Sequence, residues 1–200
     1  MSAAQNRARL FLTLPAERAS AEALACCEAF CAVADVASLL LPREMEENLA
    51  RDFVELCHRL DVAVLTAQSA DFCRRIGGDG VHLTTRDPAD VARARRLLGD
   101  DGIVGACCPA LRHEAMELGE AGADYLGIDQ RVQAKGENLL QWWAEMFTVP
   151  VVAMHPLAPQ DMAEVAALGA DFLVPRDHLW TSVTTARKEA EACMQSLSLA

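Results

Sequence analysis

Charged and hydroxyl-bearing residues follow short apolar runs at several places in this 200-residue chain. In the stretch GDGVHLTTRD, residues 78–87, a V-H-L run is followed at once by two threonines, an arginine and an aspartate. Cations and carboxylates that meet at one site suit an anionic substrate, with Mg²⁺ as a bridge between carboxylate and phosphate. Whether such residues can meet depends on the elements that carry them.

Short runs rich in leucine, valine and isoleucine alternate with segments of helical spacing along the whole chain. The runs predict strands over residues 9–14, 36–41, 62–66, 80–83, 102–106, 124–128, 150–154 and 171–175. Strands that alternate with helices indicate a parallel sheet. A doubly wound sheet usually stops at about six strands, and no G-x-G-x-x-G follows the first run. We therefore predict an α/β fold, a single-domain (β/α)8 TIM barrel over residues 1–200.

The active site of such a barrel lies at the carboxyl ends of the strands, in the loops that follow them. These positions hold a polar set in this sequence: Pro42, Arg43, Thr66, Gln68, Thr84, Thr85, Asp87, Cys107, Cys108, Asp129, Gln130, Arg131, Lys135, His155, Arg176, Asp177 and His178. We expect substrate contacts from the following members: Thr66, Thr84, Thr85, Cys107, Asp129, Arg131, His155 and Arg176. The alternative for any one of them is a solvated rim side chain without a function.

His82 lies within a predicted strand rather than after it. Alternation places Val81 and Leu83 on one face of that strand and His82 on the other, inside the barrel. A buried imidazole needs a hydrogen-bond partner. We interpret His82 as a hydrogen-bonded core residue, with a catalytic role as the alternative.

Composition and charge exclude several classes of partner and location. With 18 basic and 29 acidic residues the net charge is −11, so we expect neither a nucleic-acid partner nor an anionic membrane surface. No apolar run approaches the roughly 20 residues that span a bilayer, and the N-terminal apolar stretch is too short for a signal peptide. The eight cysteines contain no C-x-x-C pair, so we expect reduced thiols that pack as small apolar residues. These features predict a cytoplasmic protein.

Several stretches resemble the thiamine-phosphate synthases and their thiazole tautomerase relatives. GGDGVHLTTRD is similar to that family's G-A-D-G-V-H-L-G-Q-E-D, and EAGADYLGI to its G-A-D-Y-I-G-x-G. VPVVAMHPLAPQDMAEVAALGADFLVP is similar to its P-V-V-A-I-G-G-I followed by A-G-A-D. The resemblance covers essentially the whole chain. It implies a (β/α)8 barrel, commonly dimeric or larger, that joins hydroxymethylpyrimidine diphosphate to a thiazole phosphate with Mg²⁺ and releases pyrophosphate.

The same resemblance implies roles for individual residues. Asp87 matches the family's second metal carboxylate and would bind Mg²⁺. Arg43 matches the last cation of the Q-L-R-x-K pyrophosphate clamp, and Lys135 approximates the lysine of the loop after the sixth strand. Both would be catalytic, because they would neutralise the pyrophosphate leaving group.

The chain departs from the family pattern at positions where the family binds metal and phosphate. Thr66-Ala67 stands where the family has its N-D metal ligand, and Met154-His155-Pro156 replaces the Gly-Gly phosphate cradle with side chains and a proline that has no N–H. Pro175-Arg176-Asp177 replaces a turn of small residues, and Pro109 stands near the position of the tautomerase histidine. His155 and Arg176 could bind phosphate by side chain, with a rim salt bridge as the alternative.

These departures predict at most feeble turnover of the standard substrate pair, with binding of a small phosphorylated or heterocyclic ligand retained. Two alternatives stay open beside a diverged synthase. One is a thiazole tautomerase-like enzyme that needs no metal. The other is a barrel that has lost catalysis and acts by binding its ligand.

A tryptophan pair bears on assembly. Trp142 and Trp143 are adjacent in a predicted helix, about 100° apart around its axis, so both cannot easily face the barrel. An exposed tryptophan beside Met146 and Phe147 would form a contact patch. We therefore predict a homodimer or larger homo-oligomer. The alternative is a helix wedged between its neighbours that buries both rings.

Overall fold

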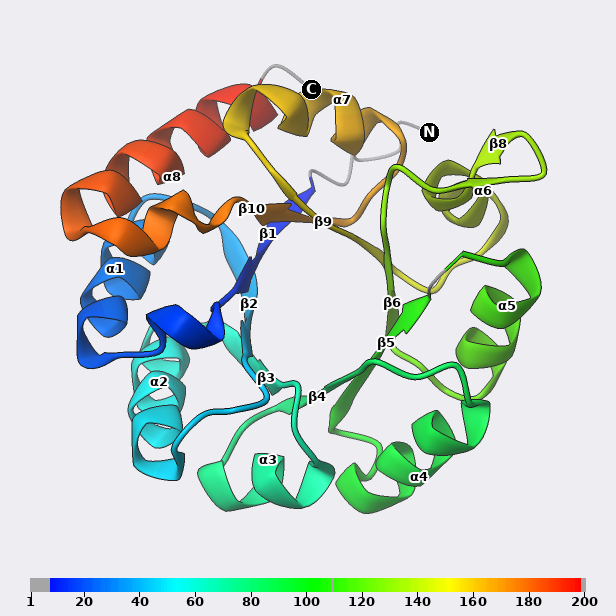
Figure 1. Cartoon of the computed structure of the whole chain (residues 1–200), viewed down its shortest axis with the longest axis horizontal. Coiled ribbons are helices and arrows are strands. Elements are labelled where there is room, and N and C mark those ends of the chain that lie inside the picture. Colours follow the sequence, from blue (N-terminus) through cyan, green and yellow to red (C-terminus); the bar gives the residue numbers. More distant parts are fainter. Residues whose placement is uncertain (1–7, 109, 199–200) are drawn as a thin grey trace, which may run out of the picture.

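The structure, a computed structural model, describes residues 8–108 and 110–198. Within these residues eight parallel strands close into a barrel (Figure 1). In order around the barrel they are β1 (Arg9–Thr13), β2 (Val36–Leu41), β3 (Ala63–Thr66), β4 (Gly80–Leu83), β5 (Ile103–Cys108), β6 (Tyr125–Ile128), β9 (Val151–Leu157) and β10 (Phe172–Pro175). The predicted TIM barrel is confirmed, and each predicted strand is found within three residues of its expected bounds.

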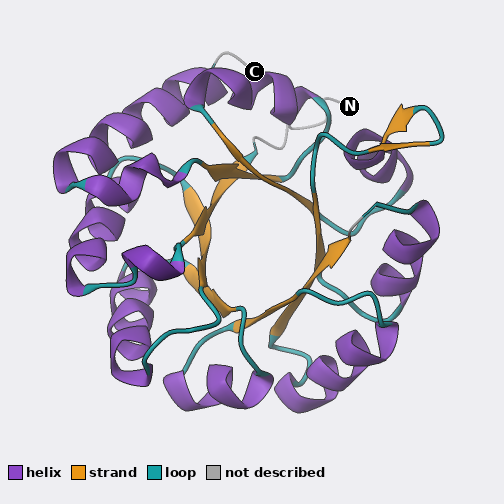
Figure 2. Cartoon of the chain, viewed as in Figure 1, coloured by secondary structure: helices purple, strands orange, loops and turns teal. Residues whose placement is uncertain are grey.

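Helices surround the barrel and cover its outer face (Figure 2). They are α1 (Ala21–Cys31), α2 (Glu47–Arg59), α3 (Ala70–Ile76), α4 (Pro88–Leu98), α5 (Arg112–Glu120), α6 (Leu139–Met146), α7 (Met162–Ala167) and α8 (Val183–Leu197), with 3₁₀ turns η1 (Ala16–Arg18), η2 (Pro159–Asp161) and η3 (Asp177–Thr181). Side chains of Ser69, Asp87, Asn138 and Ser182 accept N–H groups at the starts of α3, α4, α6 and α8. Such caps fix where a helix begins.

Apolar side chains fill both the space between strands and helices and the barrel interior. The interior cluster consists of Phe11, Leu40, Leu65, Tyr125, Val152 and Val174. His82 is 4% exposed and its ring contacts that of Tyr125. The alternation along β4 therefore places His82 inside the barrel, as predicted.

Strand β9 is longer than expected. It continues through His155 and Pro156 to Leu157, where the sequence predicts a loop after residue 154. Leu157 pairs with Pro175 of β10, and its carbonyl accepts from Arg176 N at 2.9 Å. Pro156 has no N–H, so it leaves no donor unpaired in the extended strand. The backbone groups on either side of it gain hydrogen-bond partners.

A small hairpin after β6 was not expected. It joins β7 (Gln133–Ala134) to β8 (Glu137–Asn138) through a turn at Lys135 and Gly136. Both turn residues have positive φ, 58° and 83°. Two such residues in a row are typical of the tight turns that join antiparallel strands.

The two tryptophans of helix α6 differ in burial. Trp143 is 1% exposed, donates through Nε1 to Val149 O at 2.8 Å and stacks on Phe147. Trp142 is half-buried and lies under the guanidinium of Arg112, 4.5 Å from its ring centre. The expected exposed tryptophan is therefore only half-buried Trp142 in the described α6, although Met146 in the same helix is 65% exposed. The homo-oligomer stays a prediction.

No helix within the described residues is both long and apolar enough to cross a membrane. The eight cysteines, all within the described part of the chain, are free thiols, and most of them are buried.

Candidate functional site

The carboxyl ends of the strands meet at one mouth of the barrel, and the predicted site residues divide there into two groups. The open half consists of the carboxyl ends of β2, β3 and β4 with the loops after them, and carries Arg43, Thr66, Thr84, Thr85 and Asp87. The closed half consists of the carboxyl ends of β5, β6, β9 and β10 with the loops after them, and carries Cys107, Asp129, Arg131, His155 and Arg176. The two halves differ in what their polar groups already bind.

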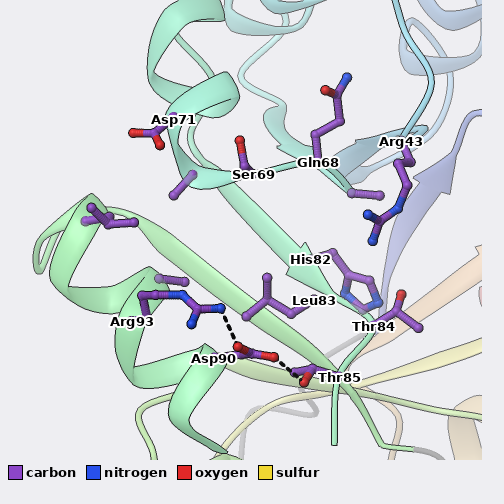
Figure 3. A pocket seen from close by; sticks show the side chains of 14 residues that line it. Arg43, Gln68, Ser69, Asp71, His82, Leu83, Thr84, Thr85, Asp90 and Arg93 are labelled. Atoms are coloured by element: carbon purple, nitrogen blue, oxygen red, sulfur yellow. Dashed lines mark hydrogen bonds and ion pairs between the residues drawn. The ribbon is translucent and has the colours of Figure 1, made fainter. Parts of the chain in front are cut away.

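A cavity of about 510 Å³ occupies the open half. Its polar lining includes Arg43, Gln68, Ser69, His82, Thr84 and Thr85 (Figure 3). Gln68 and the threonines belong to the loops after β3 and β4, as expected for a TIM-barrel site. Ser69 was not predicted, because it lies one residue beyond the rim positions and serves as the cap of α3.

One of the two carboxylates that line the cavity, Asp71 and Asp90, is neutralised within the protein. Asp90 of α4 forms an ion pair with Arg93 and accepts a hydrogen bond from Thr85 Oγ1 at 2.7 Å. Thr85 Oγ1 in turn accepts from Asp87 N at 3.0 Å. The sequence analysis did not predict Asp90 and Arg93, because they lie in helix α4 rather than in the loop before it. Their i,i+3 spacing, which is typical of helical ion pairs, could have indicated this pair.

Arg43 is the cation of this cavity that has no partner in the part of the chain that the structure describes. Its side chain is exposed, and it makes no hydrogen bond or ion pair with any residue that the structure describes. In Figure 3 its guanidinium lies at the same end of the cavity as His82 and Thr84. Arg43 is therefore free to bind an anion.

Thr66 is not placed to contact a ligand. It is fully buried, and its Oγ1 accepts from Gln68 N at 3.1 Å. Gln68 also donates through Nε2 to Met45 O at 3.3 Å. Thr66 holds the loop that presents Gln68 to the cavity, so its role in the structure is to position its neighbour.

The donor set does not fit the Mg²⁺ that the resemblance implies. Asp87 is exposed and its Oδ1 accepts from Ala89 N at 2.9 Å, so its carboxylate caps α4. The residues that the structure describes contain no group of three His, Cys, Asp or Glu side chains able to hold a metal ion. Mg²⁺ needs a near-octahedral shell of oxygen atoms, and one capping carboxylate supplies little of it.

In the closed half, an amide clasp joins two strands. Gln130, which is buried, donates through Nε2 to His155 O at 2.9 Å and accepts through Oε1 from His155 N at 3.1 Å. Asn138 Nδ2 donates to Gln130 O at 2.7 Å. The backbone at His155 is thus satisfied by Gln130, which leaves no free amide there for a phosphate.

Asp129 and Arg131 bind each other. Arg131 donates through Nε at 2.9 Å and through Nη2 at 2.6 Å to the two carboxylate oxygens of Asp129. The hydrogen bond from Arg131 lowers the pKa of the Asp129 carboxyl; partial burial opposes this, and nearby His155 adds to it. Burial, and after it the charge of Asp129, raises the pKa of the Cys107 thiol. Cys107 is therefore a thiol rather than a nucleophilic thiolate at neutral pH.

Arg176 forms the rim salt bridge that was the alternative to a phosphate site. Its Nη2 and Nε donate to the carboxylate of Glu189 in α8 at 2.6 and 3.1 Å. The Glu189 side chain is 9% exposed and that of Arg176 is 44% exposed. Because a buried carboxylate already holds the guanidinium, Arg176 and His155 do not form a shared anion site in this structure.

Lys135 belongs to neither half. It lies at the exposed tip of the β7–β8 hairpin, which Figure 1 shows outside the ring of strands, beside α6. The structure therefore does not bring Lys135 together with Arg43. Pro109, near the position of the tautomerase histidine, lies outside the described residues.

Comparison with known proteins gives consistent results. A family model described as thiamine monophosphate synthase matches residues 17–175. A thiamine-phosphate synthase of Erythrobacter litoralis is 35% identical over 72% of each chain, and one of Hyphomonas neptunium is 31% identical over 87% of this chain and 86% of that protein. The solved structure of a thiamine phosphate pyrophosphorylase from Pyrococcus furiosus covers 98% of both chains with a TM-score of 0.79. At 20% identity, that structure supports the fold alone.

Proposed function

The chain belongs to the thiamine-phosphate synthase family, and from this premise we propose that it binds a small phosphorylated heterocycle of thiamine biosynthesis in the open half, without Mg²⁺. The observation that carries the proposal is Arg43, a cation without a partner among the described residues, at a cavity of about 510 Å³. That volume lies within the range of roughly 300–1,000 Å³ typical of small-molecule sites.

The charges around the cavity favour a ligand with one anionic end. Asp90 and Arg93 cancel each other as an ion pair. The carboxylate of Asp71 also lines the cavity but lies at the opposite end from Arg43 (Figure 3), so Arg43 is the group placed to face a phosphate. Gln68 and Thr84 add neutral polar groups to the lining. A ligand with a phosphate at one end and an uncharged polar ring at the other matches this distribution of charge.

We further propose that synthase turnover is at most weak. Departure of pyrophosphate builds negative charge, and stabilising such charge is usually the largest catalytic contribution. Arg131 and Arg176 are held by carboxylates, Lys135 lies on the outer hairpin, and Arg43 is left to act alone. Each missing charged donor lowers the rate by about 10²-fold. The family's joining reaction should therefore be slow, and binding should be the main activity.

Isothermal titration calorimetry tests the binding. Thiazole phosphate, thiamine phosphate and pyrophosphate are each titrated with and without Mg²⁺. We expect binding of thiazole phosphate that does not depend on Mg²⁺ and is about tenfold weaker in Arg43→Ala. Arg96→Ala is the matched control, since Arg96 is an exposed cation of α4 outside the cavity lining. Absence of binding for all three ligands would overturn the proposal.

A coupled assay for pyrophosphate release tests the turnover. With the pyrimidine diphosphate and thiazole phosphate as substrates, we expect a rate far below that of the Erythrobacter litoralis synthase assayed in parallel. A comparable rate would contradict the proposal of weak turnover. If such a rate required Mg²⁺ yet survived Asp87→Ala, the metal would be held elsewhere than at Asp87.

We also propose that the protein acts in the cytoplasm as a homodimer or larger oligomer. The free thiols suit a reducing compartment. Exposed apolar side chains on α5 and α6, Met116 at 39% and Met146 at 65% exposed, support a contact surface. Light scattering at micromolar concentration should give at least twice the 21.6 kDa chain mass, and a monomer mass would contradict this assembly.

A further inference from the structure

Three neighbouring strands place His82, Gly105 and Tyr125 in one row across the barrel interior. His82 of β4 is in register with Gly105 of β5, and Gly105 is in register with Tyr125 of β6. The middle position of the row has no side chain. A Cβ on Gly105 would overlap the ring of Tyr125, so the ring passes over Gly105 towards His82.

The two rings meet in a defined geometry. Tyr125 Oη lies 2.8 Å from His82 Nδ1, and the ring planes are within 17° of parallel at a centroid distance of 5.6 Å. Gly127 also leaves room for the imidazole, because a Cβ there would lie 3.1 Å from His82 Cε1. The backbone of β5 and β6 is thus shaped around this pair.

The pair fixes where the imidazole carries its proton. Burial raises the pKa of Tyr125 well above its usual value, so the phenol keeps its proton. Burial lowers the pKa of His82 to about 4, so the imidazole is neutral at pH 7. His82 Nδ1 is the partner of the Tyr125 hydroxyl among the described residues. If Nδ1 carried the hydrogen, the buried phenol proton would have no acceptor there, which is costly. The phenol therefore donates to Nδ1, and Nε2 carries the ring proton.

The remaining nitrogen of His82 faces the cavity. His82 lines the cavity together with Arg43 and Thr84 (Figure 3). Among the described residues, the buried side-chain polar atoms without a partner are Arg112 Nε and Glu114 Oε2. Nε2 of His82 is not one of them, and the hydrogen bond found for the His82 ring is made by Nδ1. Nε2 is therefore not sealed off from solvent, and its N–H can donate to a ligand in the cavity.

We infer that the Nε2–H group of His82, oriented by Tyr125, is the hydrogen-bond donor that recognises an acceptor atom in the ring of the ligand. This inference rests on the proposed function and names its ligand class: a phosphate monoester of a heterocycle whose ring nitrogen is unprotonated. Arg43 binds the phosphate, and His82 selects the ring. Tyr125 is a positioning residue, since it acts through His82.

A matched pair of ligands tests this directly. Thiazole phosphate is compared with its thiophene analogue, in which C–H replaces the ring nitrogen. We expect the wild-type protein to bind the thiophene about tenfold more weakly, the order of one lost hydrogen bond. His82→Leu should weaken thiazole phosphate by a similar factor and leave the thiophene unchanged. His82→Gln, whose amide can present an N–H near the position of Nε2, should recover part of the difference. His113→Gln, at an exposed position of α5, should change the binding of neither ligand.

The outcomes separate the inference from the proposed function. If the wild-type protein binds both ligands equally, the inference fails while the proposed function stands. If it binds neither, the proposed function fails and takes the inference with it. Unequal binding that persists in His82→Leu would assign the discrimination to another residue and overturn the inference.

Nitrogen-15 NMR of the imidazoles gives a readout that does not depend on a ligand. The His82 signals are assigned by their loss in His82→Gln, and we expect the proton on Nε2. Tyr125→Phe should yield a mixture of both tautomers and bind thiazole phosphate about threefold more weakly, without a change for the thiophene. A wild-type proton on Nδ1 would overturn the inference.

Discussion

Arg43 in the open half of the barrel mouth differs from the two arginines of the closed half. In the closed half, Arg131 and Arg176 each donate two hydrogen bonds to a carboxylate of the same chain. In the open half, Arg43 has no such partner among the described residues and stands beside a cavity. All three follow a barrel strand, yet only Arg43 combines a free charge with space for a ligand. A position at the rim therefore makes a cation a candidate for ligand binding, but a nearby carboxylate of the same chain can occupy it.

The largest expected effect comes from removing a closed-half cation. Arg176→Met leaves the carboxylate of Glu189, 9% exposed, without its partner. Because Arg176 itself is 44% exposed, solvent offsets part of the loss, and we expect the free energy of unfolding to fall by about 2 kcal/mol. Urea denaturation at pH 7 measures it.

Arg131→Met is the matched control, with the same two-bond geometry at 62% exposure. It should change the free energy of unfolding by less than about 0.5 kcal/mol. Neither variant should alter binding of thiazole phosphate. If Arg176→Met kept full stability but lost binding, the closed half would be the binding half and the comparison would be reversed.

His82, at the bottom of the open-half cavity, should lower the free energy of unfolding by a similar amount as the pH falls. His82 binds a proton below about pH 6.5 when unfolded but only near pH 4 when folded. Between these values the unfolded state binds more protons, so stability decreases as pH decreases. His82 should contribute a loss of about 2 kcal/mol between pH 7 and pH 5. Unfolding free energies at both pH values should show a smaller loss in His82→Gln than in the wild type, and equal losses would show that His82 is not shielded.

The smallest effect is expected at Asp87. Asn caps a helix about as well as Asp, so Asp87→Asn should change the free energy of unfolding by less than about 0.5 kcal/mol. Addition of Mg²⁺ should raise the melting temperature of neither protein. Stabilisation of the wild type by Mg²⁺ that disappears in Asp87→Asn would restore Asp87 as a metal ligand.

The fold could be predicted because each strand and helix carries its own local signal. Apolar runs bounded by turn residues mark β2 and β4 to the residue, and the alternation along β4 puts His82 inside the barrel. The identity of its partner, Tyr125, could not be predicted, because it depends on the register of two further strands and on the absence of a side chain at Gly105.

Within the site, position was predictable and pairing was not. Spacing placed Arg176 at the rim, but Glu189 reaches it from the inner face of α8, thirteen residues later. Asp87 matched a metal-binding motif, yet in the folded chain it starts a helix. Lys135 follows β6 as expected, but the positive φ of Lys135 and Gly136 turns the chain into a hairpin that carries the side chain away. Each difference arises from a tertiary contact or a backbone turn that single residues do not announce.

Strand β9 has a consequence for how a ligand enters and leaves. Its seven residues, the Arg176 N to Leu157 O hydrogen bond and the clasp at Gln130 hold the closed half within the sheet. Backbone amides held this way open only through larger unfolding events, so hydrogen exchange at His155 and Arg176 should be slow. The closed half is then a fixed wall rather than a lid. If a ligand binds in the cavity as proposed, we expect it to enter and leave across the loops after β3 and β4, which line the cavity, without a movement of the closed half.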